Sequence, residues 1–148
     1  MATQSTPTAT LRITRRLEAP REKVFDAWTR PEALKQWFCH EGYSTLAAEA
    51  DARPGGRYLM RMLKDGETEP FHVEGTYREV RRPERLVFTW KWSHRPEMND
   101  TVVTLDLTDA GGATEISIVH ELFDTEELRD EHGIGWGKVL DSLTSHLA

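Results

Sequence analysis

The middle of the chain consists of short apolar runs separated by turn-forming residues. Between Ser44 and Phe123 the runs are STLAAEAD, GRYLMRML, FHVEGTYREV, RLVFTWKW, TVVTLDL and TEISIVHELF, and the segments between them are rich in Gly, Pro, Asp and Asn. This spacing is typical of β-strands joined by tight turns. The connections are too short for the crossovers that parallel strands require, so the pattern predicts an antiparallel meander and excludes a doubly wound parallel sheet.

One further strand and two short helices are predicted before this meander. In TLRITRRLE, Leu11, Ile13 and Leu17 alternate with polar residues, which favours a strand with one buried face although Arg15 lies on the same side. The segments APREKVFDAWT and PEALKQWF have a proline in the first turn and repeat large apolar residues at helical spacing. We therefore expect two short helices that form a bent cover over the sheet.

The chain ends in a predicted amphipathic helix. Asp124 and Glu127 have the spacing of a capping box, and apolar residues follow Trp136 at three, four, seven and eleven positions. The only apolar surface long enough to cover this stripe is the inner face of the sheet. The predicted fold is therefore of the α+β class: a curved seven-stranded antiparallel sheet wrapped around a long C-terminal helix, with two short helices after the first strand.

Length and composition limit the classes of function. The chain of 148 residues is the size of one domain, and we expect a disordered N-terminal tail over residues 1–8 and a single domain over residues 9–148. A net charge of -6 without a basic run argues against a nucleic-acid partner. Cys39 is the single cysteine, and the chain has neither a signal-peptide pattern nor an apolar run that could span a membrane. A cytoplasmic protein is the resulting expectation.

Five motifs, in this order, resemble a known family. They are VFDAWTRPEALKQWF, DARPGGRYLMRM, VEGTYREVRRPERLVFTW, TEISIVHELF and HGIGWGKVLDSL. They are similar to motifs of the bacterial proteins of the activator-of-heat-shock-protein-90-ATPase homologue family, which belongs to the START-like or SRPBCC helix-grip superfamily. The resemblance extends from about Leu11 to Leu147. It implies a helix-grip fold with an apolar cavity between sheet and C-terminal helix, which in the superfamily holds lipids, polyketides, hormones or other flat hydrophobic molecules.

The resemblance leaves three classes of function to consider. A protein that binds a small hydrophobic ligand without an organic cofactor is the first hypothesis, and a cyclase- or hydrolase-type enzyme with His120 or Tyr77 as acid or base is the second. Regulation of a chaperone ATPase is the third. It is not expected, because the eukaryotic activators carry a separate N-terminal domain and only about ten residues precede the first strand here. A homodimer is left open.

The cavity candidates follow from the strand parity and from the final helix. Alternation places large aromatic and thioether side chains on the inner face of the strands, together with one histidine. The candidate ligand-binding residues are His120, Trp90, Trp92, Tyr77, Tyr58, Met60, Met62, Phe88, Trp136 and Leu140. Such residues suit a flat apolar molecule with one or two hydrogen-bond acceptors.

His120 has two interpretations. In TEISIVHELF, period-two alternation places His120 with Ile116, Ile118 and Leu122 on an apolar face, while Val119 points the other way. A histidine on such a face is most often a hydrogen-bonded core residue. The alternative is that His120 points into the cavity and orients the ligand. Sequence alone leaves both interpretations open.

Other motifs are interpreted as structural. DARPGG, from Asp51 to Gly56, has the composition of a tight turn, and GIGWGK lacks the residues of a nucleotide-binding loop, so its glycines favour a bend or a close helix-to-sheet approach. The six histidines show no H-x3-H or HExxH spacing, so no metal is expected. No nucleophile motif is present either. Parity places His72 on the outer face.

Overall fold

The computed structural model describes residues 8–39 and 42–148, so residues 1–7 of the predicted tail, and His40, lie outside the described residues. The ten elements follow the predicted order. They are β1 (Ala9–Leu17), α1 (Arg21–Thr29), α2 (Pro31–Trp37), β2 (Tyr43–Ala50), β3 (Arg57–Lys64), β4 (Phe71–Arg81), β5 (Arg85–Trp92), β6 (Thr101–Ala110), β7 (Ala113–Phe123) and α3 (Glu126–Leu147).

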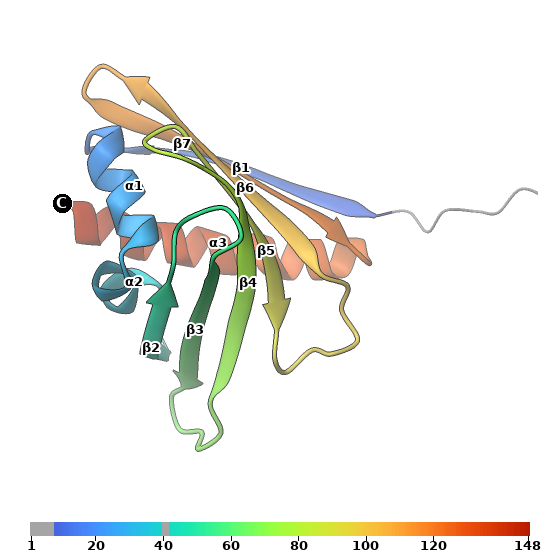
Figure 1. Cartoon of the computed structure of the whole chain (residues 1–148). Helices are drawn as coiled ribbons and strands as arrows, with labels where there is room; N and C mark the ends of the chain where they lie inside the picture. Colours follow the sequence, from blue (N-terminus) through green and yellow to red (C-terminus); the bar gives the residue numbers. More distant parts are fainter. Residues whose placement is uncertain (1–7, 40–41) are drawn as a thin grey trace, which may run out of the picture.

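The seven strands form one antiparallel sheet in the order β1-β7-β6-β5-β4-β3-β2. The strands from β2 to β7 pair in chain order, as tight connections require, and β1 closes the other edge against β7. The sheet curves around α3, and α1 and α2 lie beside the C-terminal part of α3 (Figure 1). This is the predicted helix-grip architecture.

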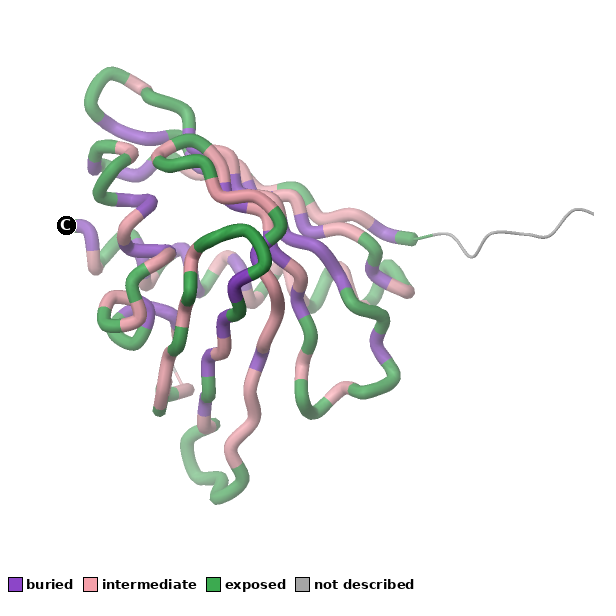
Figure 2. Tube along the Cα trace, viewed as in Figure 1, coloured by how far each residue is buried: buried purple, intermediate pink, exposed green. Residues whose placement is uncertain are grey.

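The core lies between the concave face of the sheet and the three helices. Buried positions alternate with more exposed ones along the strands (Figure 2). The apolar stripe of α3 is buried from Trp136 to Leu147, as the sequence indicates. From α1 and α2, Trp28, Leu34 and Trp37 enter the same core cluster. Burial of this many large side chains is the dominant stabilising contribution to the fold.

Two local predictions at the junction of β7 and α3 are wrong. Leu122 is 40% exposed and has a φ of 74°, whereas Phe123 is completely buried. The pairing of β1 with β7 shifts register beside this position, so the alternation breaks and Phe123 takes the inward place. The helix cap is Thr125, whose hydroxyl accepts the backbone N–H of Leu128 at 3.1 Å. Asp124 lies one residue before this cap.

The turn DARPGG is structural, as predicted. Arg53 Nε donates to an Asp51 carboxylate oxygen at 2.8 Å. Gly55 has a φ of +86°, and a Cβ at Gly56 would lie 1.9 Å from the carbonyl oxygen of Asp51. Only the first glycine therefore needs positive φ, and the second is required by a close approach of the backbone. In α3, a Cβ at Gly133 would lie 3.2 Å from the Leu11 side chain, which marks a close helix-to-sheet contact.

Candidate functional site

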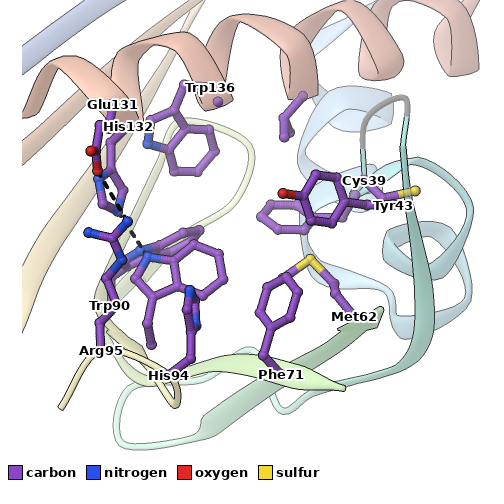
Figure 3. Close-up of a pocket in the computed structure, with 14 residues that line it drawn as sticks. Cys39, Tyr43, Met62, Phe71, Trp90, His94, Arg95, Glu131, His132 and Trp136 are labelled. Carbon is purple, nitrogen blue, oxygen red and sulfur yellow. Dashed lines mark hydrogen bonds and ion pairs between the residues drawn. The ribbon is translucent and has the colours of Figure 1, made fainter. Parts of the chain in front are cut away.

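A cavity of about 240 Å³ lies between the middle of α3 and the sheet (Figure 3). Its walls come from β2 to β5, the end of α2, the loop that follows β5, and one face of α3. Four of the predicted cavity residues line it, namely Met62, Trp90, Trp92 and Trp136. The volume corresponds to about eight water molecules at ~30 Å³ each, which is room for a small ring system.

Aromatic rings make up most of the inner wall. Trp90 lies with its ring centroid 5.3 Å from Trp92 and 5.1 Å from Trp136, and Phe38 lies 6.1 Å from Trp90. Phe71 packs against Trp92 at 5.8 Å. Rings at these separations attract one another through edge and offset contacts, so the wall is rigid as well as apolar. A flat ligand would be held between preformed aromatic surfaces.

The charged groups of the cavity lie together at one end. Arg95 Nη2 is 3.2 Å from a Glu131 carboxylate oxygen, and His94 packs at a tilt against Phe71 with ring centroids 4.8 Å apart. Figure 3 shows Arg95, Glu131 and His132 on the side opposite Met62 and Tyr43. Burial, together with the nearby Arg95, lowers the pKa of His94. The cavity therefore has an apolar interior and a polar end.

His132 fixes the orientation of Trp92. The indole N–H of Trp92 donates to His132 Nε2 at 2.9 Å, and His132 Nδ1 lies 2.8 Å from the carbonyl oxygen of Leu128. Because a carbonyl only accepts, Nδ1 carries the proton and Nε2 is the acceptor, so the imidazole is neutral. Burial lowers the pKa of His132 and supports this assignment.

His120 fixes the orientation of Trp136 in the same way. The Trp136 indole N–H donates to His120 Nδ1 at 3.0 Å, and His120 Nε2 lies 2.7 Å from the Thr101 hydroxyl oxygen. That hydroxyl donates to the carbonyl oxygen of Trp90 at 3.2 Å, so His120 Nε2 carries the proton. Burial, and secondarily the nearby His132, holds the pKa of His120 well below its usual value. Two neutral histidines thus hold two walls of the cavity.

His120 itself does not line the cavity. Its side chain is completely buried, and both ring nitrogens have partners within the protein. This arrangement corresponds to the hydrogen-bonded core interpretation, and it leaves no free nitrogen to orient a ligand. The side chain touches the back of the cavity wall, through a hydrogen bond with Trp136 and ring contacts with Trp90 and His132. Its neighbour Val119 is on the opposite face of β7, as predicted.

The remaining predicted residues lie at the other end of the interior, which is filled. Tyr58, Met60, Tyr77 and Phe88 border a space of only about 10 Å³, together with side chains from α1 and α2. This volume is at the lower limit for one water molecule, so no ligand fits there. Leu140 is completely buried in the core and lines neither space. The prediction treated the inner face as one cavity, but side chains from α1 and α2 fill one end of it.

The two tyrosines of the filled end remain protonated phenols. Burial raises the pKa of Tyr58 and of Tyr77 above the usual value, and the Tyr58 hydroxyl donates to the carbonyl oxygen of Thr89. The ring of Tyr77 packs against that of Tyr58, with the ring centroids 5.6 Å apart. Neither tyrosine lines the larger cavity, so an acid or base role for Tyr77 in that cavity has no geometric support.

Sequence reasoning missed the polar end. One face of α3 lines the cavity through His132, Gly135, Trp136 and Val139, which follow helical spacing. Counting four residues back from Trp136 along the predicted helix would have placed His132 on the same face. Arg95 lies in an irregular loop, where no periodicity indicates the direction of a side chain. Among the described residues, no group of three or more His, Cys, Asp or Glu side chains could hold a metal ion.

No helix in the described part of the chain combines the length and the apolar character that a membrane span requires.

Comparison with curated proteins gave no match. Solved structures, in contrast, match over almost the whole chain. A protein of Chromobacterium violaceum is 29% identical, with a TM-score of 0.84 over 93% of this chain and 96% of that chain. A protein of Nitrosomonas europaea is 29% identical, with a TM-score of 0.79 over 93% of both chains.

A family assignment agrees with these structures. The AHSA1 protein of Silicibacter pomeroyi is 26% identical, with a TM-score of 0.82 over 94% of this chain and 97% of that chain. Residues 18–148 match the family described as activator of Hsp90 ATPase homolog 1-like protein. This range begins next to the end of β1 and includes every element that lines the cavity. The chain therefore belongs to the activator of Hsp90 ATPase homolog 1-like family and has its helix-grip fold.

Proposed function

We propose that the protein binds a small, flat, hydrophobic molecule in the cavity between α3 and the sheet. The observation that carries the proposal is the unfilled space of about 240 Å³ between Trp90, Trp92 and Trp136. Protein interiors are normally packed without voids larger than a water molecule. A preformed apolar space of this size, lined by rigid rings, has the general character of a ligand site.

The chemistry of the walls supports an aromatic ligand over a flexible lipid chain. Trp90, Trp92 and Phe71 present ring faces and edges against which a planar molecule gains offset and edge-to-face contacts. Met62 can adapt to an irregular outline on the opposite side, because its thioether is unbranched and flexible. The volume lies just below the range of about 300–1,000 Å³ for drug-sized ligands, which limits the occupant to a small ring system.

The hydrogen bonds to the histidines support binding rather than chemistry at the same place. Trp92 and Trp136 are fixed by His132 and His120, whose nitrogens are all engaged. Preorganised walls reduce the conformational entropy that a ligand must overcome, which favours affinity. For either of these two histidines to act as an acid or base, it would instead need a free nitrogen that points at the substrate.

Native mass spectrometry of freshly purified protein tests the proposal. We expect an additional mass on the wild-type protein that denaturation releases, and no such mass on the variant Gly135→Leu. A side chain at Gly135 projects from the α3 face that lines the cavity, and a Cβ there meets no atom within 4 Å. Equal occupancy in both proteins, or an empty wild-type protein that binds no neutral bicyclic aromatic at millimolar concentration, would overturn the proposal.

A further inference from the structure

The polar end of the cavity differs from the rest in charge. Among the described residues that line the cavity, Arg95 and Glu131 are the only two with a permanently charged type of side chain, and they face each other at 3.2 Å. His94 and His132 lie beside them, and both have a lowered pKa. A ligand long enough to reach this end therefore meets a guanidinium, a carboxylate and two neutral imidazoles.

The capacity for hydrogen bonding at this end differs from group to group. Both nitrogens of His132 are used within the protein, as is the indole N–H of Trp92. The ion pair with Glu131, in contrast, engages one terminal nitrogen of Arg95, whose guanidinium carries five N–H donors in a planar fork. Arg95 thus has donors left for a second acceptor group, and this fork matches the geometry of a carboxylate.

We propose that the ligand is an aromatic carboxylic acid whose rings lie between Trp90, Trp92 and Phe71 and whose carboxylate accepts hydrogen bonds from Arg95. This inference rests on the proposed function and specifies the class of molecule that the same cavity takes.

Burial favours an anion over a cation at this position. The side chain of Arg95 is 34% exposed and that of Glu131 is 50% exposed, so the cation of the pair is the more enclosed group. In the complex, the Arg95 guanidinium would lie between the carboxylate of Glu131 and that of the ligand. Because a guanidinium is weakly hydrated, its partial burial costs less free energy than the burial of an ammonium group would. A ligand cation, by contrast, would be repelled by Arg95 as it approached Glu131.

Two probes of nearly equal shape test the inference: 2-naphthoate, which is an anion at pH 7.5, and 2-naphthylmethanol, which is neutral. We expect isothermal titration calorimetry to give at least about tenfold tighter binding of the naphthoate, the range of a charge-assisted hydrogen bond. The variant Arg95→Gln should lose about tenfold in naphthoate affinity and should bind the alcohol as the wild type does, because glutamine keeps much of the length of the side chain without the charge.

Glu131→Gln is the matched control, because it breaks the same ion pair but leaves the guanidinium in place. We expect it to bind naphthoate at least as tightly as the wild type. Equal wild-type affinity for the two probes, or equal losses of naphthoate affinity in Arg95→Gln and Glu131→Gln, would overturn the carboxylate assignment and leave the proposed function standing. If neither probe binds the wild type at millimolar concentration, the proposed function itself is wrong and this inference with it.

Discussion

The two ends of the interior are built from the same sheet and differ in what covers them. At one end, Trp28 from α1 and Leu34 from α2 pack onto Tyr58 and Phe88 and leave about 10 Å³ of space. At the other end, α3 and the loop after β5 leave about 240 Å³ between aromatic walls. Phe38, at the end of α2, borders both spaces. The cavity therefore begins where the side chains of the short helices end.

The comparison separates residues that stabilise the fold from residues available for binding. Close packing at the filled end removes apolar surface from water within the protein itself. At the cavity, Trp92 and Phe71 are only partly buried and leave apolar surface for a further molecule to cover, so part of the same hydrophobic free energy is released only on binding. Substitutions at the two ends should accordingly change different quantities.

The largest contrast is expected between two phenylalanines. Phe88→Ala, at the filled end, should lower the free energy of unfolding by about 3–5 kcal/mol, because it opens a cavity in close-packed surroundings. Phe71→Ala should cost about 1–2 kcal/mol, because Phe71 is only half-buried and already borders an open space. Urea unfolding of both variants measures the difference. Equal losses would show that the cavity is packed as tightly as the filled end.

Two glycines give the next contrast. A Cβ at Gly75 would lie 2.0 Å from the carbonyl oxygen of Thr89 and 2.7 Å from the Tyr58 ring, so Gly75→Ala must displace backbone at the filled end and should cost about 2–4 kcal/mol. Gly135→Ala, which adds a methyl group to the cavity side of α3, should stabilise the helix by about 0.5–1 kcal/mol. Opposite shifts in melting temperature are expected, and a destabilised Gly135→Ala would contradict the open cavity.

The two ends should also respond to opposite extremes of pH. His120 and His132 have lowered pKa values in the folded protein, so below about pH 6.5 the unfolded chain binds more protons and stability falls as pH falls. Each histidine contributes at most about 1.4 kcal/mol per pH unit in that window. Tyr58 and Tyr77 have raised pKa values, so their contribution is lost only as pH rises above about 10.

Urea unfolding of the wild type and of His120→Leu between pH 5 and 8 tests the predicted loss of stability at low pH. The variant leaves the Trp136 N–H and the Thr101 hydroxyl without their partner, so it should be less stable by about 1–3 kcal/mol at pH 8. Its free energy of unfolding should also depend less on pH than that of the wild type. An unchanged slope in His120→Leu would show that His120 is not the group that takes up the proton.

The fold could be predicted from the sequence, because alternating apolar residues, turn residues and the stripe of α3 each have a strong period. The topology followed from the short connections, which force neighbouring strands to pair in antiparallel fashion. The errors occurred where the period is interrupted. At Leu122 a register shift reverses the alternation, and at Thr125 two adjacent polar residues could both cap the helix.

The cavity could be predicted only in part. Parity correctly indicated that Tyr58, Tyr77 and Trp90 point inward, but a strand pattern does not tell which inward side chains other elements cover. That depends on the tertiary placement of α1 and α2, and it divides the inner face into the filled end and the cavity. Arg95 was missed because it lies in a loop, and the partners of His120 were missed because they come from β6 and α3.

The most direct test of the account is the calorimetric affinity of 2-naphthylmethanol for the wild type, Gly135→Leu and Gly137→Ala. For a ligand of about twelve heavy atoms at ~0.5 kcal/mol each, we expect a Kd on the order of tens of micromolar for the wild type. Gly137→Ala, on the same helix but outside the cavity lining, should bind equally well. Gly135→Leu should stay folded and lose binding at least tenfold. A Gly135→Leu protein that binds like the wild type would contradict the claim that this cavity is the ligand site.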